Sequence, residues 1–286
     1  MSPLRILLFG VLLPAIAAGV VLFFVWRRTP PLAGGKWSGA VAFTLGYGIA
    51  YFVAFGMPPF PPTDAMQWLV YLTMAAMFIG LVESFLQTPS WARWFWRWVF
   101  SILMLWLLLH TMVTHTWGVL KGILWILTLS LTMLLFWTAL DNLSEKVTGS
   151  LVPILFFITA LGSSVALMLG RSASVSQLCG SVTAILAVSA VVGWRQPNFT
   201  LAKGAMAVLT ALIFGFWLNG VFYAYLPMVT AILLMLSPLV GWLGQVTLMR
   251  HLPSWQSVSL QLIVALLLVG IANIIAVWLL GLPTVF

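Results

Sequence analysis

Acidic residues are almost absent from this chain, in which Asp and Glu together number 4 among 286 residues. All charged residues amount to 6%, whereas 63% of the residues are hydrophobic. Soluble domains carry about 25% charged residues, so this composition cannot cover a water-facing surface. The composition excludes a soluble protein and indicates that lipid surrounds most of the chain.

Cysteine is equally scarce, because Cys179 is the only one. No intrachain disulfide can form, and the redox compartment cannot be inferred. His-Glu-x-x-His and Gly-x-Ser-Gly motifs are also missing. His110 and His115 lie about 140° apart around a helix, which does not present two metal ligands on one face. We therefore predict no metal, no cofactor and no enzymatic activity; were the chain an enzyme, its catalyst would be His110 or Glu83.

The formal net charge is nevertheless +8. In a soluble protein such a charge would suggest nucleic acid, but here the basic residues are spread through short loops. In that position they orient helices and meet anionic lipid headgroups. The charge predicts membrane lipids as partners and no nucleic acid. It does not specify an oligomeric state.

The apolar residues form about ten stretches close to the roughly 20 residues that a helix needs to cross a bilayer. This pattern predicts an all-α fold, a polytopic transmembrane helical bundle that forms a single domain over residues 1–286. Because the first stretch is followed by Trp26-Arg27-Arg28 and not by a cleavage site, we expect it to be retained. The expected crossings are residues 4–26, 37–56, 66–87, 95–114, 118–140, 150–170, 174–194, 200–222, 225–247 and 257–280.

Basic residues fall unevenly on the two sides of this bundle. Since cytoplasmic loops are enriched in Lys and Arg, the richer side should be cytoplasmic and both termini should lie outside. The richer side holds Arg27, Arg28, Lys36, Arg93, Arg97, Lys146, Arg195, Lys203 and Arg250, and the poorer side holds Arg5, Lys121 and Arg171.

Glu83 is the only acidic residue within an expected crossing, and it lies near the cytoplasmic end of that helix. Arg93 and Arg97 begin the next crossing on the same side, which predicts an interfacial salt bridge. A proton or cation relay is the alternative. Asp64 falls in an outer loop, and Asp141 and Glu145 fall in a cytoplasmic loop, so we expect no two carboxylates to be placed for paired acid and base chemistry in the membrane.

Aromatic and basic residues alternate in residues 91–98, WARWFWRW. Trp91, Trp94 and Trp98 share one helix face, and Arg93 and Arg97 share another. The pattern is typical of an interfacial anchor; a specific anionic-lipid site is the alternative.

Small residues recur at four-residue spacing, as in Ala76, Gly80 and Ser84. Such seams predict close packing of neighbouring helices. Pro14 and Pro238 lie inside expected crossings, where we predict kinks.

Polar side chains also gather in the outer half of the expected bundle. The first turn of the 174–194 helix has free N–H groups and directly follows Arg171, an arrangement that could hold an anionic or carbonyl-bearing ligand. The alternatives are scattered hydrogen bonds between helices and an ordinary Ser-capped turn. The predicted ligand-binding residues are Arg171, Ser174, Ser176, Gln177, Lys121, His110, Asn219 and Asn273.

Ten crossings in under 300 residues resemble the drug/metabolite transporter superfamily, which is built from two inverted five-helix halves. The resemblance covers length and helix count; those carriers usually keep the N-terminus inside, whereas the charge distribution here places it outside. Residues 170–180, GRSASVSQLCG, also resemble a stretch found in uncharacterised bacterial multi-pass membrane proteins. For a bacterial protein the cell membrane concerned would be the inner membrane.

The leading functional hypothesis is a transporter or permease-like carrier of a small solute or lipid. The alternative is a structural or assembly subunit of a membrane complex, and a membrane-embedded enzyme comes third. A cavity reaching into the bundle would favour the carrier or the enzyme, and a fully packed bundle would favour the subunit.

Overall fold

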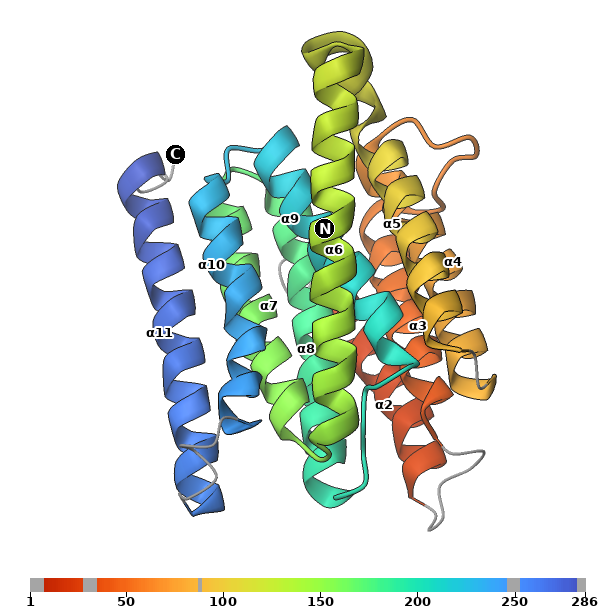
Figure 1. Cartoon of the computed structure of the whole chain (residues 1–286), viewed down its shortest axis with the longest axis vertical. Helices are drawn as coiled ribbons and strands as arrows, with labels where there is room; N and C mark the ends of the chain where they lie inside the picture. Colours follow the sequence, from red (N-terminus) through yellow and green to blue (C-terminus); the bar gives the residue numbers. More distant parts are fainter. Residues whose placement is uncertain (1–7, 28–34, 87–88, 246–252, 282–286) are drawn as a thin grey trace.

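The computed structural model describes residues 8–27, 35–86, 89–245 and 253–281. These ranges contain helices and no strands. Ten helices are long and apolar enough to cross a membrane, and they run side by side along the long axis of the molecule (Figure 1). The predicted all-α transmembrane bundle is confirmed.

The helices follow the expected crossings closely. The first crossing joins a π-helical turn to an α-helix, and two others end in a short π or 3₁₀ segment. The elements are η1 (Leu8–Leu12) with α2 (Leu13–Trp26), α3 (Trp37–Phe55), α4 (Ala65–Phe85), α5 (Ser90–Met112) with η3 (Val113–Trp117), α6 (Val119–Lys146), α7 (Leu151–Leu169), α8 (Ala173–Arg195), α9 (Ala205–Tyr223), α10 (Met228–Leu239) with η4 (Val240–Gln245), and α11 (Ser254–Leu280).

Three boundaries differ from the prediction by five residues or more. Helix α5 begins at Ser90, directly after Pro89, because proline readily precedes a helix start. Helix α6 continues to Lys146, six residues beyond its expected end. Helix α9 begins only at Ala205, since residues 196–204 form a loop in which Lys203 has a φ of 63°.

Both internal prolines lie next to a change of helix type. Pro14 is the second residue of α2, immediately after the π turn η1. Pro238 lies near the end of α10, which passes into the 3₁₀ segment η4. Proline removes a backbone donor and crowds the preceding turn, which accounts for the π turn before Pro14.

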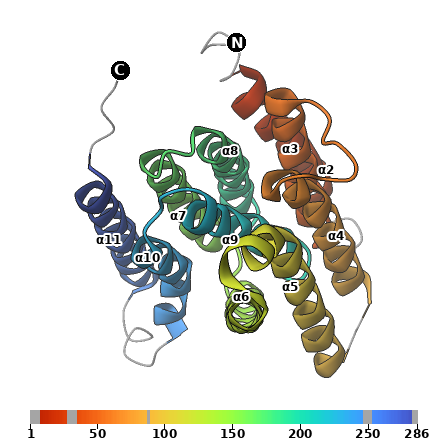
Figure 2. The same cartoon turned by 90° about the horizontal axis from the view of Figure 1, so that it is seen from above.

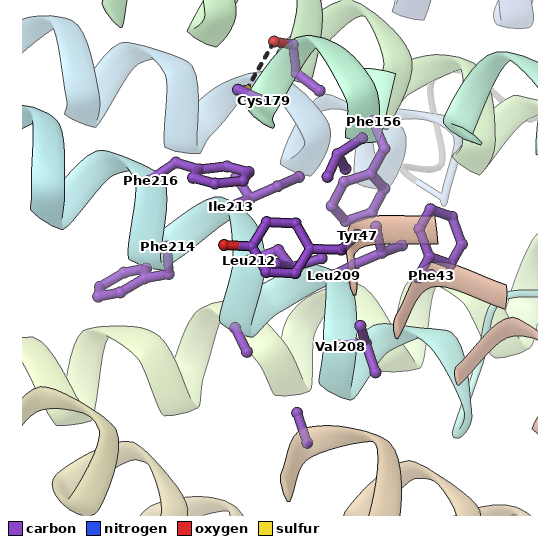
Figure 3. Packing of buried hydrophobic residues seen from close by; sticks show 14 of the residues in the cluster. Phe43, Tyr47, Phe156, Cys179, Val208, Leu209, Leu212, Ile213, Phe214 and Phe216 are labelled. Carbon is purple, nitrogen blue, oxygen red and sulfur yellow. Dashed lines mark hydrogen bonds between the residues drawn. The ribbon is translucent and has the colours of Figure 1, made fainter. Parts of the chain in front are cut away.

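Helix α9 occupies the centre of the bundle, and α11 lies at its edge (Figure 2). In the most apolar 18-residue segment of each helix, 89% of the α9 segment is buried inside the protein, compared with 22% of the α11 segment. Tyr47 of α3 packs edge-on against Phe216 of α9, with ring centroids 6.0 Å apart. Figure 3 shows Phe43 and Tyr47 beside the apolar side chains of α9 that build this core. Because α9 packs against protein on nearly all sides, its position is fixed, and so are the positions of the residues at its two ends.

The two ends of the bundle carry different chemistry and are named here for it. The pocket end contains the turns 56–64, 170–172 and 224–227, and the ion-pair end contains the turns 147–150 and 196–204. Because the number of crossings is even, Leu8 and Leu280 lie at the same end, the pocket end. That the ion-pair end faces the cytoplasm remains a prediction from the charge distribution.

Candidate functional site

Three charged side chains meet inside the bundle near the ion-pair end. Arg97 of α5 donates from Nε to Oε1 of Glu83 at 2.7 Å and from Nη2 to Oε2 at 2.6 Å. The same Nη2 lies 2.6 Å from Oδ2 of Asp141 on α6. The three side chains are 3%, 4% and 2% exposed. The expected ion pair of Glu83 is therefore present, with Arg97 as its partner, and both side chains are buried within the protein.

Asp141 corrects the prediction that it lies in a loop. The polar residues around it predict a loop, yet it lies within α6 and is buried. Its Oδ2 accepts from Arg97 and its Oδ1 accepts the backbone N–H of Lys203 at 2.6 Å. The indole of Trp137, one turn earlier, lies 5.0 Å from the Arg97 guanidinium carbon. These partners satisfy the carboxylate, which lets the helix continue through it.

The loop before α9 completes this arrangement. Lys203 lies 2.9 Å from Glu145 through its Nζ, and both side chains are about one-third exposed. Thr200 donates from its hydroxyl to the carbonyl of Ser144 at 2.6 Å. We call Glu83, Arg97, Asp141, Glu145 and Lys203 the ion-pair network. It holds three of the four acidic residues of the chain and ties α4, α5 and α6 to the loop that leads into α9.

Glycines allow the backbones to approach closely around this network. A Cβ on Gly80 of α4 would collide with the carbonyl oxygen of Gly204, and a Cβ on Gly204 would collide with the carbonyl of Lys36. A Cβ on Gly39 of α3 would lie 2.6 Å from that of Ala205. The predicted close packing at the Gly80 seam is confirmed, and its partner is a loop backbone as well as a helix.

The pocket end contains two adjoining cavities. One, of about 390 Å³, lies among the starts of α4 and α8 and the ends of α5 and α9. The other, of about 340 Å³, lies between the start of α4 and the end of α5. Thr63, Asp64, Ala65 and Thr111 line both, so the two cavities adjoin. We call them together the outer pocket.

Three of the eight predicted ligand-binding residues line the outer pocket. Ser174 at the start of α8 and Asn219 of α9 face the first cavity, and His110 of α5 lines the second. Asn219 is buried and donates from Nδ2 to the carbonyl of Gly215 on its own helix at 2.9 Å. His110 packs edge-on against Trp106, with centroids 5.7 Å apart. These residues form one part of the expected constellation.

The other five lie elsewhere. Ser176 exchanges hydrogen bonds with Ser164 between α7 and α8, at 2.7 and 2.8 Å. Asn273 donates to Val269 on its own helix at 2.9 Å. Gln177 packs near Gly10 of η1. The remaining two, Arg171 and Lys121, are exposed. The structure therefore does not assemble the eight residues into one site.

The sign of the pocket charge also differs from the expectation. The guanidinium of Arg171 lies 5.7 Å from the Tyr225 ring centroid and does not line the outer pocket. The charged side chain that lines both cavities is Asp64. An anion held at the start of α8 by Arg171 is therefore unsupported, because Arg171 does not line the pocket and the carboxylate of Asp64 does.

Sequence reasoning missed Asp64, Thr111 and Tyr223, which line the pocket. Asp64 caps α4 by accepting the N–H of Gln67 at 2.8 Å, a pattern visible in the spacing Asp-x-x-Gln. The phenol of Tyr223 donates to the carbonyl of Leu108 at 2.6 Å. No local signal indicates that α5 and α9 meet here, because that depends on packing.

Arg93 is not bonded to Glu83. It lines an apolar cavity of about 330 Å³ between α4 and α5, and its Nε is buried without a hydrogen-bond partner among residues 8–27, 35–86, 89–245 and 253–281. A further apolar cavity of about 300 Å³ lies between α6, α9 and α10 and has no charged lining residue.

Comparison with known protein families, curated proteins and solved structures finds no match to this chain. Among the residues that the structure describes, no group of three or more His, Cys, Asp or Glu side chains could hold a metal ion.

Proposed function

We propose that the protein is a carrier in the cell membrane that takes up a small polar solute at the outer pocket. The observation that carries this proposal is that the same elements serve both ends. Helix α4 has Asp64 as its N-cap and Glu83 near its other end, and α5 has Arg97 in its first half and His110 near its end. A tilt of these helices against their neighbours would couple the opening of one end to the closure of the other.

The lining of the pocket suggests the class of solute. Besides Asp64 it presents the hydroxyls of Thr111, Ser174 and Tyr223 and the amide of Asn219. These groups suit a neutral hydroxyl- or amide-bearing solute or a cation, and they disfavour an anion. A volume of about 390 Å³ falls in the range of about 300–1,000 Å³ typical of small-molecule sites.

The ion-pair network would close the path at the opposite end. Its core of Glu83, Arg97 and Asp141 is buried and braced by the loop before α9, so opening it requires these partners to separate. Helix count and length, which resemble those of the drug/metabolite transporter superfamily, are consistent with a carrier.

Thiol labelling tests the coupling without knowledge of the solute. In a Cys179→Ser background, Asn219→Cys reports the pocket end, and Thr210→Cys reports the buried centre of α9. A membrane-impermeant maleimide should label Asn219→Cys from the pocket side and leave Thr210→Cys unlabelled. Adding Asp141→Asn should increase labelling of Thr210→Cys from the ion-pair side by about fivefold, the effect of a shift of about 1 kcal/mol toward a minor state, and should decrease that of Asn219→Cys by a smaller factor.

The matched control is Glu145→Gln, which alters the one-third exposed pair with Lys203, leaves the buried contacts of Arg97 intact and should leave both rates unchanged. The decisive feature is the opposite direction of the two changes. If Asp141→Asn increases both labelling rates, the variant has merely loosened the bundle, and a structural or assembly subunit becomes the better proposal.

A further inference from the structure

An apolar groove runs between α4 and α5 close to the ion-pair end. Its cavity of about 330 Å³ is lined by Phe78, Ile79, Val82, Glu83, Arg93 and Trp96. Phe78, Val82 and Trp96 are exposed on the lateral surface of the bundle. Because that surface faces lipid in a membrane-spanning bundle, the groove opens toward the bilayer. We call it the α4–α5 groove.

Arg93 places a positive charge in this groove. Both carboxylate oxygens of the neighbouring Glu83 already bind Arg97. Arg93 makes no salt bridge within the described ranges, and its buried Nε has no hydrogen-bond partner there. A buried guanidinium donor without an acceptor is unfavourable, so a ligand that brings an acidic oxygen would be stabilised.

The residues around Arg93 favour an amphiphilic ligand. Trp91 and Trp94 are exposed beside Arg93 on the first turns of α5, a position in which indoles commonly mark the headgroup level. The apolar part of the groove lies along α4, toward the membrane centre from Arg93. A phosphate at Arg93 and a hydrocarbon chain along Phe78 and Val82 would match both parts.

We propose that the α4–α5 groove binds one anionic phospholipid from the leaflet at the ion-pair end, with its phosphate at Arg93. One acyl chain lies along Phe78, Val82 and Trp96. The charge of the headgroup distinguishes this lipid from its neighbours, since Arg93 attracts an acidic lipid more strongly than a zwitterionic one. The inference does not depend on the carrier proposal, because the groove is separate from the outer pocket.

Native mass spectrometry of the full chain in detergent tests the preference. Phosphatidylglycerol and phosphatidylcholine of equal chain length are added in turn, and the first bound lipid is quantified. Wild-type protein should bind phosphatidylglycerol at least about tenfold more tightly, a free-energy difference of about 1.4 kcal/mol. Arg93→Gln should bring the two lipids to within about twofold, whereas Arg195→Gln, which changes an exposed arginine at the same end, should retain the preference.

Two further measurements locate the lipid. Phosphatidylglycerol with a photoreactive acyl chain should label residues 78–82 and Trp96, and Val82→Trp, which fills an exposed part of the groove, should reduce that labelling at least about fivefold. Glycerol phosphate at the same concentration should not displace the lipid, because it lacks the acyl chain.

Several results would overturn the proposal. These are equal binding of the two lipids by wild-type protein, an equal loss in Arg93→Gln and Arg195→Gln, labelling spread evenly over the lateral surface, and displacement by glycerol phosphate. A melting temperature measured for each variant in the same detergent separates lost lipid binding from lost folding.

Discussion

The pocket end and the ion-pair end are built from the same helices, but polar groups pair with one another at the ion-pair end and face a cavity at the pocket end. At the ion-pair end Glu83, Arg97 and Asp141 satisfy one another and are almost fully buried. At the pocket end Asn219 bonds to its own helix and also faces a cavity, as does Asp64. Polar groups that find protein partners fasten helices together, whereas those that face a cavity remain available to a ligand.

The largest expected effect concerns which end faces the cytoplasm, because a reporter lies either inside or outside. A reporter fused after Phe286 should be external, and one inserted between Val147 and Thr148 should be cytoplasmic, because the Lys- and Arg-rich side stays inside. Enzymatic reporters that act on only one side of the membrane measure this. A cytoplasmic reporter at Phe286 would reverse the assignment of the two ends.

The largest stability effect should come from Arg97→Met. This change leaves Glu83 and Asp141 buried without their cation and should lower the free energy of unfolding by about 3–5 kcal/mol. Arg93→Met, on the same helix and outside the network, should cost less than about 1 kcal/mol. Denaturant titration in detergent compares the two.

A second experiment tests whether the loss in Arg97→Met comes from the unpaired carboxylates. The triple variant Glu83→Gln, Arg97→Met and Asp141→Asn removes the charges together and should recover part of the loss. If Arg97→Met is no more harmful than Arg93→Met, the ion-pair network does not hold the helices together.

Glycine substitutions should have the next largest effect. Gly80→Ala brings a Cβ against the carbonyl of Gly204 and should cost about 1–3 kcal/mol, since backbone must shift. Gly48→Ala, also within a helix, meets no atom within 4 Å and should be neutral or stabilise by up to about 1 kcal/mol. Thermal unfolding of the pair measures the difference, and equal melting temperatures would contradict the close approach.

At the pocket end the expected effects are smaller. Asp64→Ala removes the cap of α4 and should cost about 1 kcal/mol, whereas Asp64→Asn keeps an acceptor and should cost only a few tenths. Both variants remove the pocket charge. Thermal unfolding should therefore separate them, while labelling of Asn219→Cys by a cationic thiol reagent should fall equally in both.

The smallest effect should come from Glu145→Gln. Its partner Lys203 is one-third exposed, and such pairs contribute about 0.2–1 kcal/mol and weaken with salt. When unfolding is measured at low and high ionic strength, the difference in unfolding free energy between wild-type protein and Glu145→Gln should become smaller as salt rises. A loss as large as that of Arg97→Met would mean that the network acts as one buried unit.

The local chemistry of several groups could be predicted because it depends on neighbours in sequence. Glu83 and Arg97 are separated by a short turn, so their pairing follows from helix order and side. The positions of Pro14 and Pro238 imply altered helix geometry for the same local reason. Asp141 escaped prediction because its partners, Arg97 and the N–H of Lys203, are 44 and 62 residues away.

The predicted ligand site shows the corresponding limit. Depth in the membrane could be assigned to Ser174, Asn219 and Asn273 from their distance to a helix end. Which helices adjoin could not, and Asn273 lies on the edge helix α11 while Asn219 lies on the central α9. The expected pocket therefore contained residues of matching depth that belong to different surfaces.

The sequence by itself determined the solvent of this protein, the number of its crossings and the alternation of their direction, because each helix must satisfy its own backbone in lipid. Tertiary structure alone decided that α9 is central, that two carboxylates share Arg97 and that Asp64 lines the outer pocket. Those outcomes depend on which lateral surfaces fit together. Side chains from distant segments supply that fit, and no local pattern encodes it.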